Sequence, residues 1–161
     1  YYDYGNHRIR YARWNGSAWL TEDTMNRYTE ALSLAFAPGG QAAVAYWNWS
    51  DPKLAYMTKG TYGWSAQTVE TLPSVYNAHA SLAFAPDGHP AIAYHDDEHG
   101  YLKYAKYDGA QWAIGTIDAD GFVGAYCSLA FSPDGRPAIS YYDAGRGVLK
   151  LAERVEGVRL P

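Results

Sequence analysis

The chain repeats itself at a nearly constant interval, and this repetition limits the folds open to it. The hexapeptide SLAFAP at residues 33–38 returns at residues 81–86 and, as SLAFSP, at residues 128–133. Each serine is followed thirteen residues later by an aromatic and polar cluster, and the chain opens with the same cluster: Tyr1-Tyr2-Asp3, Tyr46-Trp47-Asn48, Tyr94-His95-Asp96 and Tyr141-Tyr142-Asp143. A period of 48 and then 47 residues predicts a repeat architecture.

Each unit contains four short β-like runs and no helical periodicity. In the third unit these runs cover residues 81–84, 90–94, 101–107 and 112–117. The sequences Ala85-Pro86-Asp87-Gly88 and Ser132-Pro133-Asp134-Gly135 predict tight turns, because proline fixes φ and glycine accepts a positive φ. Four antiparallel runs in roughly 47 residues predict an all-β fold, a β-propeller-type repeat with four-stranded antiparallel blades.

About three and a half such blades fit in the chain, as repeats 1–45, 46–93 and 94–140 and a partial repeat 141–161 of a single domain. Closed propellers usually have about four to eight blades, and an open one would expose unpaired strand edges. We therefore expect residues 1–30 or 145–161 to pair with another copy of the chain or with further blades of a longer protein.

Composition excludes several classes of function. A net charge of −4 argues against a nucleic-acid surface. No apolar run approaches the length of a membrane span. The only cysteine, Cys127, has no intrachain partner and is expected to be a buried structural thiol.

One face of the predicted propeller is rich in aromatic and polar side chains. The loops between the second and third strands of each blade and the connections between blades share this face, and the connections carry Tyr28, Tyr76, Asn77, His79, Phe122 and Tyr126. Aromatic rings beside carboxylates and amides suit a sugar, which offers a C–H surface and hydroxyls. The predicted ligand-binding residues are Tyr2, Trp47, Asn48, Trp49, His95, Asp96, Tyr142 and Asp143.

A structural interpretation of the same residues stays open. The first tyrosine of each cluster can pack between blades, and Asp3, Asn48, Asp96 and Asp143 can cap their own loops as Asx-turns. The varying positions, Trp47 and Tyr142 among them, are the ones we expect on exposed loops. By contrast, Trp19, Trp64 and Trp112 open the fourth strands and are expected in the core.

Metal binding, catalysis and glycosylation have weaker signals. His79, His95 and His99 are weak metal candidates, with calcium favoured if carboxylates dominate, and we expect no cofactor. The carboxylates of residues 96–98 share a polar loop, which does not favour glycosidase chemistry, so no catalytic residue is predicted. Two sequons place possible N-glycosylation at Asn15 and Asn48, both in predicted loops.

The pattern S-L-A-F-x-P-D-G-x-P-A-I-x-Y-Y-D, followed by L-K-Y-A and G-x-x-W, is clearest in residues 81–152. It resembles the tandem β-propeller repeats of secreted and surface proteins of bacteria and archaea, which implies a secreted or cell-surface location. Propellers host many functions, and the S-x-D-x-G-x-T-W box of sialidases is absent. We expect an extracellular module that binds carbohydrate or a surface protein and is not an enzyme. The alternatives are a structural or assembly module of a larger protein or polymer and, third, a glycosidase.

Overall fold

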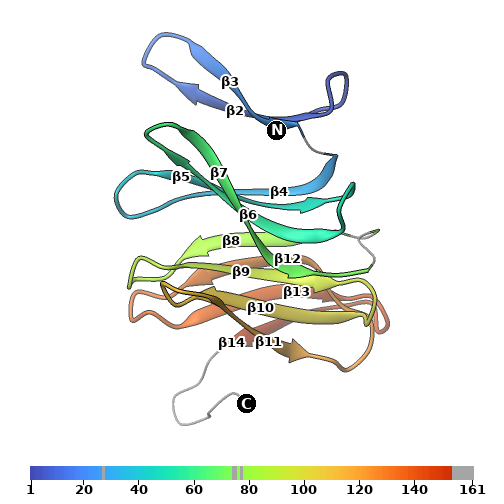
Figure 1. Ribbon diagram of the computed structural model, residues 1–161. Helices are drawn as coiled ribbons and strands as arrows, with labels where there is room; N and C mark the ends of the chain where they lie inside the picture. Colours follow the sequence, from blue (N-terminus) through green and yellow to red (C-terminus); the bar gives the residue numbers. More distant parts are fainter. Residues whose placement is uncertain (27, 74–75, 77, 154–161) are drawn as a thin grey trace.

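The computed structural model describes residues 1–26, 28–73, 76 and 78–153. These residues form β-strands and turns without a helix, so they contain no helix that could cross a membrane. The strands build four antiparallel sheets that follow one another along the chain and stack face to face (Figure 1). The predicted all-β class with antiparallel sheets is confirmed. Asn77 and residues 154–161, which the sequence analysis also discussed, lie outside the described residues.

The sheets differ in how many strands they hold. The first contains β1 (Tyr2–Asp3), β2 (Arg8–Trp14) and β3 (Trp19–Asn26). The second contains β4 (Thr29–Phe36), β5 (Ala42–Asn48), β6 (Lys53–Gly60) and β7 (Gly63–Thr71). The third contains β8 (Ala80–Phe84), β9 (Pro90–Asp96), β10 (Tyr101–Tyr107) and β11 (Trp112–Asp118), and the fourth contains β12 (Val123–Phe131), β13 (Pro137–Asp143) and β14 (Val148–Glu153).

Register shows which strands are equivalent. Tyr2 pairs with Ile9, Trp47 with Leu54, and Tyr142 with Leu149, so β1, β5 and β13 occupy the same place in their sheets. The first sheet therefore holds the second, third and fourth strands of the pattern, and the fourth sheet holds the first three. The second, third and fourth sheets each begin with the strand that contains the SLAF sequence. The repeats of the sequence analysis were counted from the tyrosine cluster, which lies in the following strand, so the bounds of the repeats and of the sheets differ.

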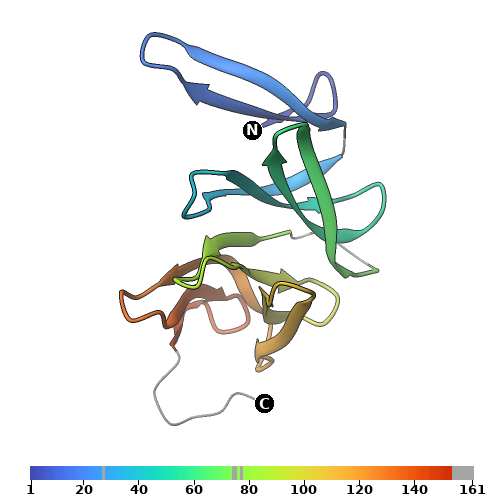
Figure 2. The ribbon, with the colours of Figure 1, turned by 60° about the vertical axis from the view of Figure 1, so that its left-hand side comes forward.

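The repeated serine links each sheet to the next one. The amide of Leu82 in the third sheet donates a hydrogen bond of 2.9 Å to Ser33 Oγ in the second. The amide of Leu129 in the fourth sheet donates in the same way to Ser81 Oγ, also at 2.9 Å. The first strands β4, β8 and β12 consequently lie side by side through the stack (Figure 2). This contact accounts for the Ser-Leu pair at the start of the repeat.

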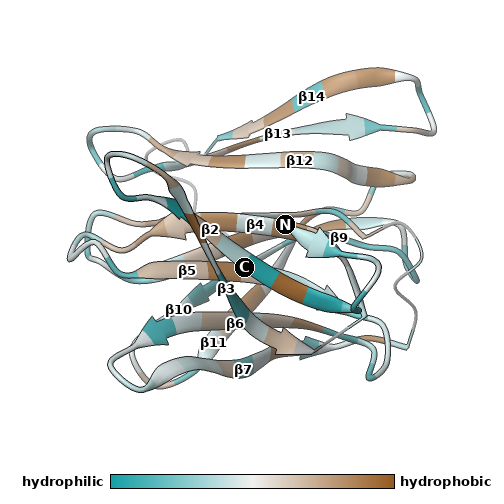
Figure 3. Cartoon of the chain, turned by 90° about the horizontal axis from the view of Figure 1, so that it is seen from above, coloured by the Kyte–Doolittle hydropathy of each residue, from teal (hydrophilic) through white to brown (hydrophobic). Residues whose placement is uncertain are grey.

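The core lies between the sheets, and small residues allow the strands to approach closely. Ala43, Ala45, Ala91 and Ala93 are all fully buried. Hydrophobic segments run along β4, β5 and β12 (Figure 3). Cys127 is buried as predicted, its thiol donates to the carbonyl of Ala93 at 3.4 Å, and burial raises its pKa to about 12.

The first tyrosine of the second, third and fourth clusters packs against the fourth strand of the preceding sheet, as its structural interpretation predicted, whereas Tyr1 is 56% exposed. Tyr94 Oη donates to Glu70 at 2.6 Å, and Glu70 also pairs with Lys103. Tyr141 Oη donates to Asp118 at 2.7 Å in the equivalent junction, where Lys150 completes the group. Burial first, and then the adjoining carboxylate, raises the pKa of both phenols. They therefore remain neutral donors.

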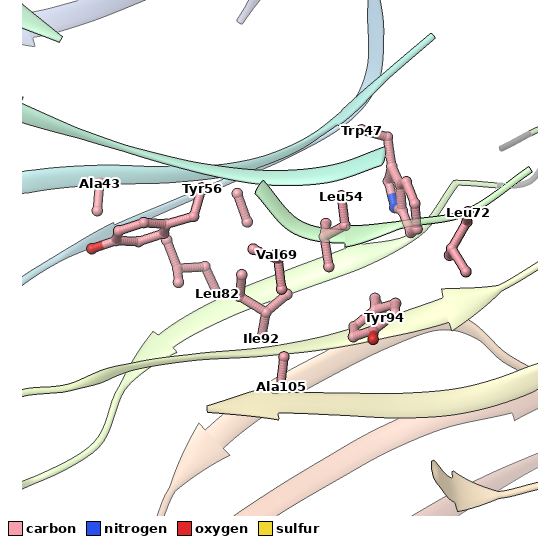
Figure 4. Packing of buried hydrophobic residues seen from close by; sticks show 11 residues of the cluster. Ala43, Trp47, Leu54, Tyr56, Val69, Leu72, Leu82, Ile92, Tyr94 and Ala105 are labelled. Carbon is pink, nitrogen blue, oxygen red and sulfur yellow. The ribbon is translucent and has the colours of Figure 1, made fainter. Parts of the chain in front are cut away.

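Two expectations about tryptophan are wrong. Trp47 is 1% exposed rather than a loop residue, because it packs edge-on against Tyr94 with ring centroids 5.9 Å apart (Figure 4). Trp19 is 67% exposed rather than buried, because no described sheet precedes the first one. Trp64 and Trp112 are partly buried against the core.

Candidate functional site

An aromatic contact recurs where each sheet connects to the next. The loops after β1, β5 and β9 lie at one end of the stack (Figure 1), beside the connections that lead into the following sheets. A ring from the loop side packs on a ring from the connection in all three junctions: His7 on Tyr28 at 4.4 Å, Trp49 on Tyr76 at 5.8 Å and His95 on Phe122 at 4.8 Å. The aromatic face predicted from the sequence is therefore real, but its rings largely contact one another.

The polar residue of each cluster caps its own loop. Asp3 Oδ1 accepts from the amides of Gly5 and Asn6, and Asn48 Oδ1 accepts from the amide of Ser50 at 3.1 Å. Asp96 and Asp143 accept from the amides of His99 and Arg146. Asn48, Asp96 and Asp143 are buried. Their burial does not fit the predicted ligand-binding role, and the Asx-turn interpretation is confirmed.

An open pocket remains between the first and second sheets. It measures about 370 Å³, and we call it the junction pocket. Its lining combines the β1–β2 loop, the connection before β4 and the β5–β6 loop: Tyr2, Tyr4, His7, Tyr28, Thr29, Trp49 and Ser50. Tyr4, Tyr28 and Trp49 are exposed, so ring surface is available to a ligand.

The rings of the junction pocket are held by contacts with each other. Tyr2 and Tyr4 meet edge to face with centroids 4.7 Å apart, and Tyr2 Oη lies 3.2 Å from His7 Nδ1. Trp49 is anchored through its backbone, whose amide donates to the carbonyl of Tyr28 at 2.8 Å. The walls are therefore partly preformed, which lowers the entropic cost of ordering them around a ligand.

The backbone of His7 is strained. Its φ is +51°, whereas the equivalent loop positions after β9 and β13 hold Gly100 and Gly147 at φ values of +74° and +70°. A left-handed conformation is uncommon for a residue other than glycine, and such strain concentrates at functional sites. The imidazole that this strain places against Tyr28 forms a wall of the junction pocket.

The polar groups of the junction pocket are hydroxyls, the imidazole of His7 and the indole N–H of Trp49. Thr29 is 4% exposed, and its Oγ1 has no hydrogen-bond partner among the described residues. Burial is the main cause that raises the pKa of Tyr2, and the neighbouring Tyr28, Tyr4 and Asp3 raise it further. The phenol of Tyr2 therefore remains a hydrogen-bond donor. The described lining residues include no carboxylate, lysine or arginine. The pocket therefore suits an uncharged ligand with both an apolar face and hydroxyls.

The equivalent positions in the next two junctions are filled by the protein itself. In the second junction Trp47 replaces Tyr2, and its Nε1 donates to the carbonyl of His79 at 3.4 Å. In the third, His95 is 1% exposed and its Nδ1 lies 2.7 Å from the carbonyl of Val123, while Arg146 closes the outer side by binding Asp120. The expectation that His95 is an exposed ligand-binding residue is also wrong.

Of the predicted ligand-binding residues, only Tyr2 and Trp49 line the junction pocket. Tyr142 is half-buried in the fourth sheet, away from this pocket. His7, Thr29 and Ser50 were missed, because their residue types carry no signal without the geometry. The sequons also differ: Asn15 is exposed in the β2–β3 turn, whereas Asn48 ends β5 with a buried side chain, contrary to its predicted loop location.

The weak metal candidates do not form one site. His99 lies with Asp96 and Glu98, with ligand atoms within 4.8 Å of one another. Asp96 Oδ2 is already engaged by His99 Nδ1 at 3.1 Å and lies 3.6 Å from Lys103 Nζ. His79 instead contacts the ring of Tyr126, with centroids 4.4 Å apart. Burial is the main cause that lowers the pKa of His79, and the neighbouring His95 lowers it further.

No family model and no curated protein matches the chain. Among solved structures it is similar to AofleA from Arthrobotrys oligospora, with a TM-score of 0.62 and 17% identity over 90% of this chain and 46% of that one. It is also similar to a leech intramolecular trans-sialidase, solved with 2,7-anhydro-Neu5Ac, with a TM-score of 0.50 and 16% identity over 86% of this chain and 26% of that one. The chain thus spans less than half of either structure. These likenesses show the fold.

Proposed function

We propose that this chain is part of a β-propeller that binds a neutral carbohydrate in the junction pocket and that the protein is secreted or located at the cell surface. The observation that carries the proposal is a pocket of about 370 Å³ whose walls hold five rings and whose polar side chains carry no carboxylate, lysine or arginine. Sugar rings stack on such walls, and their hydroxyls exchange hydrogen bonds with neutral donors and acceptors. The leech enzyme gives support of a general kind, because a similar fold there holds a sugar derivative.

The side chains in the pocket support a proposal of binding rather than catalysis. Glycoside hydrolysis usually needs two carboxyl groups on opposite sides of the bond that breaks. The described residues that line the junction pocket include no carboxylate and no arginine. The nearby Asp3 carboxylate accepts a hydrogen bond from the side chain of Asn6, and this bond is the main cause that lowers the pKa of Asp3. The backbone amides of Asn6 and Gly5 lower it further. A protein of the cell surface remains the alternative ligand.

A glycan array probed with the whole chain tests the proposal, followed by calorimetry on the sugars that bind. Trp49→Ala removes a ring face and should weaken binding by about 1 kcal/mol, which is roughly fivefold. Tyr62→Ala is the matched control, because this fully exposed ring lies in the β6–β7 turn, outside the pocket lining. Equal affinity of both variants, or an array without any hit, would contradict a carbohydrate site in this pocket.

Thr29→Val separates a ligand contact from a packing role. Valine has nearly the same shape and removes only the unpartnered hydroxyl. If a sugar hydroxyl bonds to Oγ1, the substitution should weaken binding by about 1 kcal/mol or more without loss of stability. If Thr29 only packs, the variant should bind normally and be equally or more stable, because it no longer buries an unpaired polar atom.

A further inference from the structure

Among the residues that the structure describes, two residues other than glycine adopt a left-handed backbone. They are His7, at a φ of +51°, and Tyr126, at a φ of +53°. Each belongs to a pair of one histidine and one tyrosine ring whose centroids are 4.4 Å apart: His7 with Tyr28, and His79 with Tyr126. The first pair lines the junction pocket, and the second lies outside that lining. Because backbone strain of this kind concentrates at functional sites, the second pair is a candidate binding surface.

A β-bulge turns the Tyr126 ring outward. The register of β12 on β13 shifts between Ala125 and Ser128, so Tyr126 and Cys127 lie in the bulge. Cys127 is buried and its thiol donates into the core, whereas Tyr126 is 73% exposed. A bulge re-aims a side chain without ending the strand, and this one presents a tyrosine ring to solvent.

The repeat itself does not require a strained backbone at this position. Ala31 and His79 hold the place of Tyr126 in the second and third sheets, because all three lie two residues before the repeated serine. Neither Ala31 nor His79 has a positive φ, although β4 also shifts its register at this point. The strain is therefore specific to Tyr126, and a requirement of the shared fold does not account for it.

His79 gives the exposed ring a fixed and neutral support. Its carbonyl accepts from Trp47 Nε1 at 3.4 Å and from the amide of His95 at 3.1 Å. The hydrogen bond from the amide of Leu129 to Ser81 Oγ joins β12 to β8 beside the pair. Burial, the main cause, lowers the pKa of His79, so near neutral pH its imidazole offers one donor and one acceptor. A preformed ring face beside uncharged polar groups suits a ligand with an apolar face and hydroxyls.

We propose that the ring of Tyr126 and the imidazole of His79 form a second carbohydrate-binding site, which we call the bulge site. A sugar stacks its C–H face on the tyrosine ring and exchanges hydrogen bonds with the phenol and the imidazole. The choice of a neutral sugar as ligand rests on the proposed function, because the two pairs of histidine and tyrosine share their chemistry. The position of the site rests on the strain, the bulge and the exposure of Tyr126.

NMR on the whole chain with ¹³C-labelled tyrosine rings tests the bulge site, because Tyr28 and Tyr126 report on the two sites separately. The probes are glucose, galactose, mannose and N-acetylglucosamine, each titrated in turn. With at least one of them the Tyr126 ring signals should shift saturably, and they should do so also in Trp49→Ala, which weakens the junction pocket. The signals of Tyr62, a fully exposed ring in the β6–β7 turn, should not shift and control for unspecific stacking.

The outcomes of this titration separate the two proposals. Shifts at Tyr28 without shifts at Tyr126 would overturn the bulge site and leave the junction pocket standing. Shifts at Tyr126 without shifts at Tyr28 would support the bulge site and contradict the proposed function. Equal shifts at Tyr62 and Tyr126, or no shift at either site with any of the four sugars, would overturn the bulge site.

Tyr126→Gly distinguishes a ligand contact from a packing role. Glycine accepts the positive φ, so the variant should unfold at the same or a higher temperature than the parent chain. Sugar affinity at the bulge site, followed through ¹⁵N signals of the His79 imidazole, should fall by about fivefold or more because the stacking face is lost. If the glycine variant does not fold, Tyr126→Asn also tolerates the left-handed backbone and should weaken binding equally. Unchanged affinity in a folded variant would show that the ring only packs on His79, and the proposal would fail.

Discussion

The first and second junctions are built to the same plan from different residues, and the difference separates a site from a core. Where the second junction has Trp47 buried against Tyr94, the first has Tyr2 at the edge of an open pocket. Where the second joins Tyr94 to Glu70 and Lys103, the first places Tyr46 Oη 4.0 Å from Met25 Sδ. The second junction is closed by its own side chains, and the first leaves ring surface free.

The largest expected effect tests whether Trp47 is core. Trp47→Ala should destabilise the chain by about 3–5 kcal/mol, because it removes a buried ring and leaves a cavity. Tyr2→Ala, the equivalent change in the first junction, should cost about 1 kcal/mol or less, because its ring is only half-buried. Urea denaturation followed by circular dichroism measures both. Similar losses for the two variants would mean that the junctions do not differ as described.

The next effect concerns the tyrosine hydroxyls. Tyr94→Phe leaves Glu70 without its phenol donor in a partly buried place and should cost about 1–3 kcal/mol. Tyr46→Phe removes the contact of the hydroxyl with Met25 Sδ, which is weaker than a hydrogen bond to a carboxylate, and should cost less stability than Tyr94→Phe. The same denaturation experiment compares them, and a larger loss for Tyr46→Phe would reverse our ranking of the junctions.

Much of the fold was predictable because the repeat carries strong local signals. The Pro-Asp-Gly turns and alternating strands located β8 to β11 to within two residues at each end. The Asx-turns at Asp3 and its equivalents also follow from local chemistry, because an Asp side chain caps the amides next to it in sequence.

The candidate site was less predictable because it depends on contacts between sheets. Trp47 and Trp49 are two residues apart on the same loop side, yet only Trp49 is exposed, since the facing residue of the next sheet decides which ring is covered. Nothing local in the sequence indicates that His7 takes a glycine conformation or that Thr29 Oγ1 lacks a hydrogen-bond partner among the residues that the structure describes.

A smaller effect concerns the strain at His7. His7→Gly should relieve the left-handed backbone and raise stability by up to about 1 kcal/mol, while weakening sugar binding because a wall of the pocket is lost. Gly100→His is not a useful reverse control, because a Cβ there would lie 2.9 Å from Phe122. Thermal unfolding and calorimetry on the same His7 variant supply both readouts. A variant that loses stability and keeps full affinity would show that His7 serves packing alone.

The smallest effect is the pH dependence of the first junction. Glu22 of β3 accepts from Lys59 Nζ at 2.6 Å and from Trp64 Nε1 at 2.9 Å, so it ties the first sheet to the second. The hydrogen bond from Lys59 is the main cause that lowers the pKa of Glu22, against an opposing effect of burial. A carboxyl whose folded-state pKa is lowered stabilises the fold above its unfolded pKa of roughly 4.3, and this contribution is lost as the pH falls through the lower folded value.

Acid should therefore loosen the first junction through this contact, whereas in the second junction the Trp112 Nε1 has no partner among the described residues that could titrate in the same way. Hydrogen exchange of β3 and β7 amides between pH 6 and pH 3, corrected for intrinsic rates, measures the effect. Glu22→Gln should remove most of the pH dependence specific to β3, because the amide keeps a hydrogen-bond acceptor but does not ionise. An unchanged profile in that variant would show that a different group controls the acid response, and the two junctions would then differ in packing but not in electrostatics.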